Sequence, residues 1–299
     1  MSNFELSDSQ SYPEKSSTLP SSPAGEFIVQ FWGVRGLIPT PSSNTSRYGG
    51  NTACVEMYVA GKRLIFDGGT GLRILGKTWQ EVQQPLEAHL FFTNCQSNRI
   101  QGFPFFAPAF IVENCFHIYG TAASNGASIK QCLYDQMLQP HFPYRLQVMQ
   151  SGLHFYNLTP ESDVKLDDVT ITTALINQTQ RSVGYRVNWK EYSVAYVTDL
   201  HPNADQLERE RILQFIKGVD LLIANATYTP PTSHNHDSAD ILWQPAVNAA
   251  LNGGVKRLVI SHHHPDDQDD FLDQIQVDVK SAFPQAVLAH EGLVLAVGK

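Results

Sequence analysis

A polar loop directly after an apolar run is the first place in this chain where chemistry could occur. It carries four polar side chains, Asn94, Gln96, Asn98 and Arg99. Three of them are neutral amides, and the fourth is a guanidinium that stays charged and has no lone pair to offer a metal ion. Amides and guanidinium groups instead suit hydrogen-bonded networks and anions. The loop therefore predicts a polar site that lacks the usual metal ligands.

Side chains that do bind metals occur in two other places. Asp199 follows the strand-like run Ser193–Val197, and the three histidines at 262–264 follow the apolar run Leu258–Ile260. Carboxylates and neutral imidazoles are zinc ligands, but a zinc site usually needs at least three protein ligands. Cys95 lies inside the polar loop without a neighbouring histidine to act as a base, so we expect it to be a packing residue.

The elements that must position these residues alternate between strands and helices. Strand-like patterns are frequent, and apolar residues at helical spacing predict four helices between them. We expect an α/β arrangement with helices packed on the outside of two central sheets, formed by two successive halves of the chain. The predicted strands are 27–32, 54–59, 63–66, 168–173, 185–187, 193–197, 221–223, 258–260 and 292–297, and the helical stripes cover 129–137, 207–216, 243–251 and 271–282.

The sequence resembles the metallo-β-lactamase superfamily, in a branch similar to phosphodiesterases. The resemblance covers nearly all of residues 27–299, and some segments are similar in style to cyanobacterial members. It implies an αββα sandwich whose active members hold two metal ions, often zinc, manganese or iron, with a bridging water. The segments that carry it are Phe31–Pro39, Arg47–Thr52, Ile65–Gly71, the loop after Thr93, Val183–Arg186, Ala195–Asp199 and Val255–His263.

The resemblance also places the metal-ligand positions, and most of them are substituted. The first loop places its ligand positions on Asn94, Gln96, Asn98 and Arg99, and the next histidine position falls on Gln178. A later histidine position falls on Asp240. Only Asp199 and His262, with His263 as an alternative to His262, keep ligand chemistry. The resemblance gives Asp67 a supporting role behind the loop, where we expect structural hydrogen bonds.

The pattern of losses predicts a hydrogen-bonded pocket, because metal charge and ligand charge have been removed together. We expect Arg99 to reach toward Asp199, into the space of the former metals, and we expect no metal cofactor. Two alternatives stay open. His201, His234, His236, His263 and His264 could rebuild a zinc, manganese or iron site, and Arg99 with Arg181 could bind a small anion or nucleotide.

Three functions follow from these alternatives. The leading hypothesis is a catalytically inactive metallo-β-lactamase-fold protein, a pseudoenzyme with a regulatory or protein-interaction role. The second is a metal-dependent hydrolase or phosphodiesterase with a rebuilt, mononuclear site. The third is a sensor for a small anionic ligand.

Composition bounds the partners and the compartment. The 299 residues carry a formal net charge of −8, which disfavours broad nucleic-acid or anionic-membrane binding. The four cysteines show no disulfide framework, so we expect a reducing cytoplasm. We expect a disordered tail over residues 1–25 that is neither a signal peptide nor a membrane anchor, and one domain over 26–299. A protein partner and a homodimer are expected, with no interface assigned.

Overall fold

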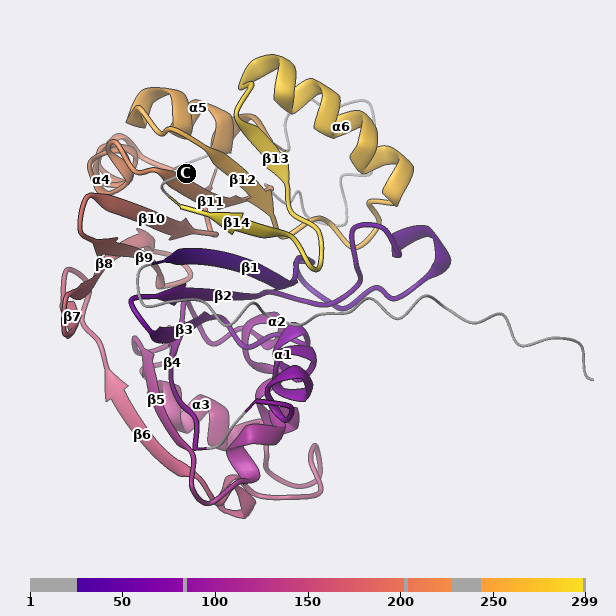
Figure 1. Ribbon diagram of the computed structural model, residues 1–299, viewed down its shortest axis with the longest axis vertical. Helices are drawn as coiled ribbons and strands as arrows, with labels where there is room; N and C mark the ends of the chain where they lie inside the picture. The colour runs from indigo at the N-terminus through magenta and orange to yellow at the C-terminus, as the bar shows by residue number, and fades with distance from the viewer. Residues whose placement is uncertain (1–25, 83–84, 202–203, 227–242, 298–299) are drawn as a thin grey trace, which may run out of the picture.

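The computed structural model describes residues 26–82, 85–201, 204–226 and 243–297, so the predicted tail lies outside the described residues. Two seven-stranded sheets form the centre of the molecule (Figure 1). The first has the order β14-β1-β2-β3-β4-β5-β6 and the second the order β13-β12-β11-β10-β9-β8-β7. The first sheet contains β1 (Phe27–Gly33), β2 (Cys54–Val59), β3 (Lys62–Phe66), β4 (Glu87–Phe92), β5 (Cys115–Gly120), β6 (Gly152–Asn157) and β14 (Val294–Ala296). The second contains β7 (Asp163–Leu166), β8 (Val169–Asn177), β9 (Ser182–Trp189), β10 (Tyr192–Val197), β11 (Leu221–Asn225), β12 (Leu258–Ser261) and β13 (Ala286–Leu288).

Helices cover the outer face of each sheet. On the first sheet these are α1 (Gly71–Trp79), α2 (Ser97–Ile100) and α3 (Ile129–Asp135), with the short 3-10 helices η2 (Phe103–Phe105), η3 (Ala107–Phe110) and η4 (Leu146–Val148). On the second sheet they are α4 (Gln206–Ile216), α5 (Gln244–Gly253) and α6 (Asp269–Ala282), and η1 (Ser43–Thr45) lies in the loop after β1. The predicted αββα sandwich is therefore confirmed.

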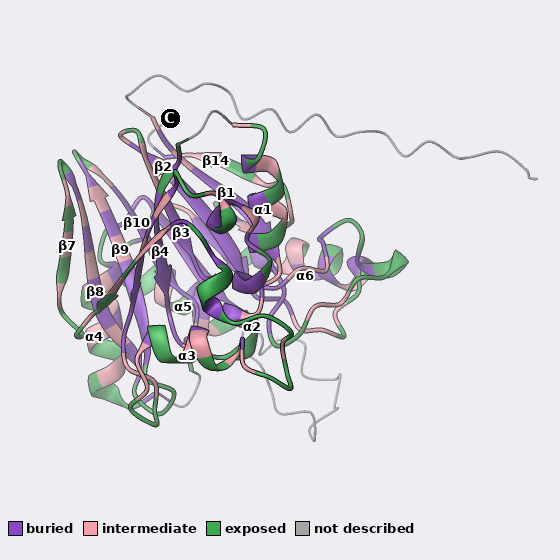
Figure 2. Ribbon diagram, turned by 90° about the horizontal axis from the view of Figure 1, so that it is seen from below, coloured by how far each residue is buried: buried purple, intermediate pink, exposed green. Residues whose placement is uncertain are grey.

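Three apolar layers hold this sandwich together, and the buried residues follow the sheets in Figure 2. The middle layer packs side chains such as Phe66 and Phe91 of the first sheet against Tyr185 and Tyr196 of the second. An outer layer joins α1 and α3 to the first sheet, and another joins α4, α5 and α6 to the second. Each strand of the sheet centres therefore buries both faces, which explains the unbroken apolar runs at β11 and β12.

Two expectations about this architecture need correction. The sheets do not divide the chain into two successive halves, because the last strand, β14, pairs with β1 in the first sheet. The aspartates that follow His264 predict a solvated helix start, and they do lie at the start of α6, but one of them is not solvated. Asp269 is buried, and its carboxylate accepts hydrogen bonds from the backbone N–H groups of Arg47 and Tyr48 at 2.8 and 3.2 Å.

No helix in the described ranges is both long and apolar enough to cross a lipid bilayer.

Candidate functional site: a buried arginine cluster

The polar loop after β4 is held by close backbone contact with the glycine-rich turn after β3. The N–H of Gly68 donates to the carbonyl of Arg99 at 2.6 Å, and the N–H of Gly102 donates to the carbonyl of Gly68 at 2.9 Å. A Cβ at Gly102 would lie 1.9 Å from the carbonyl oxygen of Gly69, so only glycine permits this approach. The contact fixes α2 and turns Arg99 inward, toward the ends of β10 and β12.

Arg99 is the centre of the site. Its side chain is 2% exposed, and its Nη1 donates to Asp67 Oδ2 at 2.8 Å and to Thr198 Oγ1 at 3.0 Å. Its Nη2 donates to Asp199 Oδ1 at 3.0 Å and to the Thr198 carbonyl at 3.2 Å. Nη1 also makes a short contact with Nε2 of His262. The predicted contact between Arg99 and Asp199 is confirmed, and we call Arg99, Asp67, Asp199, Thr198 and His262 the arginine cluster.

Asp67 has the supporting role that was expected of it. It accepts the backbone N–H and the hydroxyl of Thr93, both at 2.9 Å, and the hydroxyl of Tyr196 at 3.0 Å. Burial raises the pKa of the Asp67 carboxyl, while Arg99 and the Thr93 donors oppose that shift. The buried carboxylate is therefore stabilised chiefly by one opposite charge and by three donors around it.

His262 joins the cluster as a neutral imidazole. Burial holds its pKa well below the usual value, and the positive charge of Arg99 acts in the same direction. Because Nη1 of Arg99 is always a donor, Nε2 of His262 is the acceptor and Nδ1 carries the proton. Within the described residues, Nδ1 is buried without a hydrogen-bond partner. His263 lies in different surroundings, with Nε2 at 2.7 Å from the carbonyl of Ala289, so His262 and not His263 meets Arg99.

Of the remaining predicted ligand positions in the described residues, Asn94 contacts the cluster, whereas the side chains of Gln96, Asn98 and Gln178 do not. Asn94 is buried, and its Nδ2 donates to Asp199 Oδ2 and to Ser182 Oγ, both at 2.9 Å. Gln96 is exposed, and its side chain donates to Gln180 at 3.2 Å. Gln178 is exposed, and Asn98 is buried. Neither has a side-chain hydrogen bond to the cluster within the described part of the chain. Asp240, His234 and His236 lie outside the described residues.

The two arginines of the predicted anion site differ in their surroundings. Arg99 already faces two carboxylates, whereas Arg181 is exposed on the turn before β9 with a left-handed φ of 53°. That arrangement disfavours a shared anion site, because the charge of Arg99 is compensated inside the protein. Cys95 is partly buried, and burial raises the pKa of its thiol, which favours the expected packing role.

The donor set does not fit a two-metal centre. Asp199 and His262 are the predicted ligand positions that meet in the cluster and have side chains able to bind a metal. The guanidinium of Arg99 is hydrogen-bonded to both. Arg99 cannot be deprotonated or act as a ligand, so it opposes a cation at this place. Among the described residues, no group of three or more His, Cys, Asp or Glu side chains could hold a metal ion.

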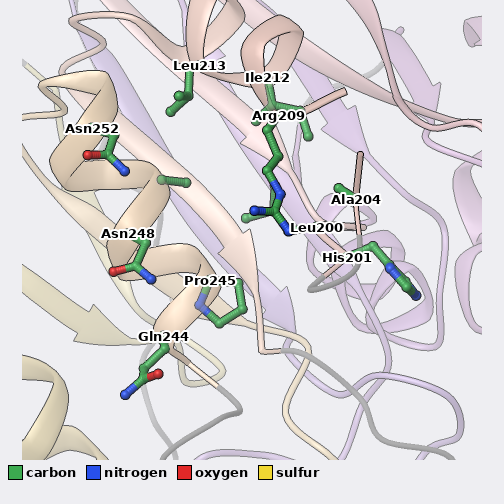
Figure 3. Close-up of a pocket in the computed structure, with 11 residues that line it drawn as sticks. Leu200, His201, Ala204, Arg209, Ile212, Leu213, Gln244, Pro245, Asn248 and Asn252 are labelled. Carbon is green, nitrogen blue, oxygen red and sulfur yellow. The ribbon is translucent and has the colours of Figure 1, made fainter. Parts of the chain in front are cut away.

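A separate pocket opens beside this site, between α4 and α5. Its volume is about 400 Å³, and Leu200, directly after Asp199, forms part of its floor. Figure 3 shows Arg209 extending from α4 into the space, opposite Asn248 and Asn252 on α5. None of the five cluster residues lines it, and sequence reasoning did not find it because its lining comes from two helices and a loop.

Sequence reasoning also missed two members of the hydrogen-bond network. Thr198 contacts Arg99 through both its hydroxyl and its carbonyl, and Ser182 accepts from Asn94. Thr198 could have been found from its place beside Asp199 at the end of β10. Ser182 lies 88 positions from Asn94, and no local pattern brings these two residues together.

Comparisons with known proteins agree with this geometry at the level of the fold. No protein-family model matches the sequence. Ribonuclease Z of Bacteroides thetaiotaomicron is 31% identical over 100 residues, which are 31% of this chain and only 29% of that protein.

Solved structures match over nearly the whole chain. The metallo-β-lactamase-fold protein YhfI from Bacillus subtilis has 18% identity and a TM-score of 0.62, covering 90% of this chain and 98% of that one. A diphosphatase from the PhnP family has 13% identity and a TM-score of 0.63, with 91% and 97% covered. The short form of human tRNase Z has 16% identity and a TM-score of 0.61, with 90% and 98% covered. The chain has the metallo-β-lactamase fold.

Proposed function

We propose that this metallo-β-lactamase-fold protein is a pseudoenzyme that has a regulatory or protein-interaction role and does not hydrolyse substrate. The observation that carries the proposal is the position of Arg99, whose guanidinium donates to both Asp199 and His262. The ligand chemistry that remains is therefore used within the protein. The fold positions these side chains, and a permanent internal cation takes their hydrogen bonds.

Charge balance supports the proposal. The cluster contains one guanidinium and two carboxylates, and Asp67 is fully buried while Asp199 has a 13% exposed side chain. Introducing a dication beside Asp199 would bring it close to the guanidinium in a low-dielectric site, where repulsion is strong. Moving Arg99 away would leave the buried carboxylate of Asp67 without its opposite charge, which is costly.

The backbone supports descent from a working site. Asp67 and His262 both have a φ of 60°, in the left-handed region that non-glycine residues seldom adopt. Such strain concentrates at functional sites, where the surrounding structure enforces it. Both residues now contact Arg99. The strained geometry that suits a reaction centre is kept, while the side chains of both residues bond to the guanidinium of Arg99.

Metal content and turnover test the proposal together. Protein purified without chelator is analysed for zinc, manganese and iron, and assayed with an activated phosphodiester such as bis(p-nitrophenyl) phosphate in the presence of each metal. We expect less than stoichiometric metal, no turnover, and no change in either with Asp199→Ala. Asp163→Ala, which removes an exposed carboxylate of β7 far from the cluster in sequence, is the matched control.

One result would overturn the proposal. Stoichiometric metal that is lost with Asp199→Ala, together with hydrolysis that is also lost, would establish the alternative of a hydrolase with a rebuilt site. In that case the additional ligands would have to come from segments such as the one that contains His234 and His236.

A further inference from the structure

The edge of the first sheet at β6 differs from the other three sheet edges. β13 and β14 are three residues long, and β7 carries the charges of Asp163 and Lys165 among four residues. β6 has six residues, Gly-Leu-His-Phe-Tyr-Asn, with no proline, lysine, arginine or carboxylate. Short length and charge are the usual means by which edges avoid pairing with other chains. β6 lacks both and forms the outer margin of its sheet in Figure 1.

Two ladders of stacked rings cross β4, β5 and β6 and end at this edge. His89, His117 and His154 stand in register, with ring centroids 4.8 and 5.3 Å apart. Two residues further along each strand, Phe91, Tyr119 and Tyr156 stack with centroids 4.6 and 4.7 Å apart. His89, Phe91 and Tyr119 are buried and His117 has intermediate exposure, whereas His154 is exposed and Tyr156 is 41% exposed. Within the described residues, no further ring stacks on the outer faces of His154 and Tyr156.

The free backbone groups of β6 can be assigned from its pairing with β5. The N–H of Gly152 donates to Asn114, and the N–H of Leu158 donates to Gly120, both at 2.9 Å. Alternate residues point to the same side of a strand, so the even-numbered residues of β6 face β5. Leu153, Phe155 and Asn157 therefore direct their N–H and C=O groups away from the sheet.

Half of the exposed large apolar side chains lie in the segment of the chain that ends in this strand. Six of the twelve large apolar residues that are exposed in the described part of the chain belong to residues 105–156. The carbonyl of Ala109 accepts the N–H of Ser151 at 3.1 Å, which places η3 beside the start of β6. The six residues are Phe105, Phe110, Val112, Tyr144, Val148 and Tyr156.

We propose that β6 pairs antiparallel with β6 of a second copy of this chain, about a two-fold axis at Phe155. The outward groups of Phe155 then bond to those of the same residue in the second copy, and Leu153 lies opposite Asn157. His154 falls opposite Tyr156 at a non-hydrogen-bonded position, where side chains approach most closely. The two sheets join into one, and each histidine ladder continues into the aromatic ladder of the second copy.

A histidine ring and a tyrosine ring already stack and lie within hydrogen-bond distance inside one copy. Within one copy, Nδ1 of His117 lies 3.2 Å from the hydroxyl of Tyr156, and the two rings stack with centroids 5.9 Å apart. The pairing of His154 with Tyr156 across the axis repeats this combination. A two-fold axis also matches an isologous interface, in which one self-complementary patch serves both subunits. Because His154 and Tyr156 flank Phe155 on the same strand, a second copy of β6 supplies two His–Tyr pairs of the kind already present within one copy, and this favours a second copy over an unrelated strand.

The inference adds a location and a partner to the interaction role proposed above. It uses residues of β4, β5 and β6, and none of them belongs to the arginine cluster. The metal analysis and the test of this interface can therefore fail independently.

Oligomeric state and cross-linking test the pairing in the full chain. Sedimentation velocity between about 1 and 100 μM, a range set by common dimer affinities, should show a dimer. Tyr156→Lys places two like charges near the axis and should raise the dimer dissociation constant by at least about tenfold. The matched control is Asp163→Lys, which adds a lysine to the edge strand β7 and should leave the dimer unchanged.

Cysteine cross-linking tests the register and does not depend on the lysine variant. Phe155→Cys should give a disulfide-linked dimer under mild oxidation, because paired strands bring the two Cα atoms to about 5.5 Å. Leu153→Cys should not, since the two copies of residue 153 lie about 14 Å apart in this register. A monomer throughout the concentration range overturns the proposal. So does a dimer that tolerates Tyr156→Lys and forms no Phe155→Cys cross-link.

Discussion

The arginine cluster and the ring ladders of β4, β5 and β6 differ in where their side chains find partners. In the cluster, the guanidinium of Arg99 is buried between Asp67 and Asp199, and its charge is compensated inside the fold. In the ladders, stacking begins in the core and stops at the exposed rings of β6. The comparison teaches that buried polar groups need partners from the same chain, whereas an open edge can take its partners from outside.

The largest test of this comparison removes the cation from the cluster. Arg99→Met leaves the carboxylates of Asp67 and Asp199 without the opposite charge, so the free energy of unfolding should fall by about 3–5 kcal/mol. Urea denaturation at pH 7 measures the loss. Arg181→Met, at an exposed turn, is the control and should change stability by less than about 0.5 kcal/mol.

A second substitution shows whether the loss comes from charge. Asp67→Asn removes one of the two carboxylates, so adding it to Arg99→Met should cost less than it does alone, with a coupling of about 0.5–3 kcal/mol. Asparagine also tolerates the left-handed backbone at this position. Strict additivity of the two substitutions would mean that Arg99 stabilises the fold by packing and not by its charge.

The two regions also differ in how far sequence could predict them. The contact of Arg99 with Asp199 was predictable, because the resemblance placed both residues at positions that surround a common centre. The contact of His262 with the guanidinium was not predictable, because it depends on the path of the long Arg99 side chain. The strands β5 and β6 were missed as well. Their pairing is with segments about 30 residues away, and strand formation depends on such neighbours more than on local preference.

The acidic run before α6 shows the same limit. A helix start with several aspartates predicts a solvated surface that favours the helix dipole. Asp269 is nevertheless buried, because its carboxylate accepts the N–H groups of Arg47 and Tyr48, more than 220 positions earlier in the chain. Periodicity identifies the helix, but only the folded chain shows which of its polar residues receives a distant donor.

The pH dependence of stability probes the inner end of the histidine ladder. Burial lowers the pKa of His89 to about 4, and His117 beside it acts in the same direction. Below pH 6.5 the unfolded chain binds a proton at this residue that the folded chain does not, so the contribution of His89 is lost as pH falls toward 4. Between pH 7.5 and 5, His89→Phe should lose about 1–2 kcal/mol less stability than the wild type, allowing for partial solvent screening.

Urea denaturation at the two pH values measures this difference. Phenylalanine keeps a ring to stack on His117, so the ladder itself should persist. Equal pH dependence in the variant and the wild type would contradict the prediction, because it would show that the pKa of His89 is the same in the folded and the unfolded chain.

The smallest effect is expected at Gln96, in the loop that also carries Asn94 and Arg99. Gln96 is exposed, and its side chain bonds only weakly to Gln180, so Gln96→Ala should change the free energy of unfolding by less than about 0.5 kcal/mol. Its backbone N–H still donates to Asn94 in the variant. Asn94→Ala, by contrast, removes the buried donor shared by Asp199 and Ser182 and should cost about 1–3 kcal/mol. Because the two residues stand two positions apart in one loop, equal losses would mean that the loop itself, and not its contact with the cluster, sets the cost.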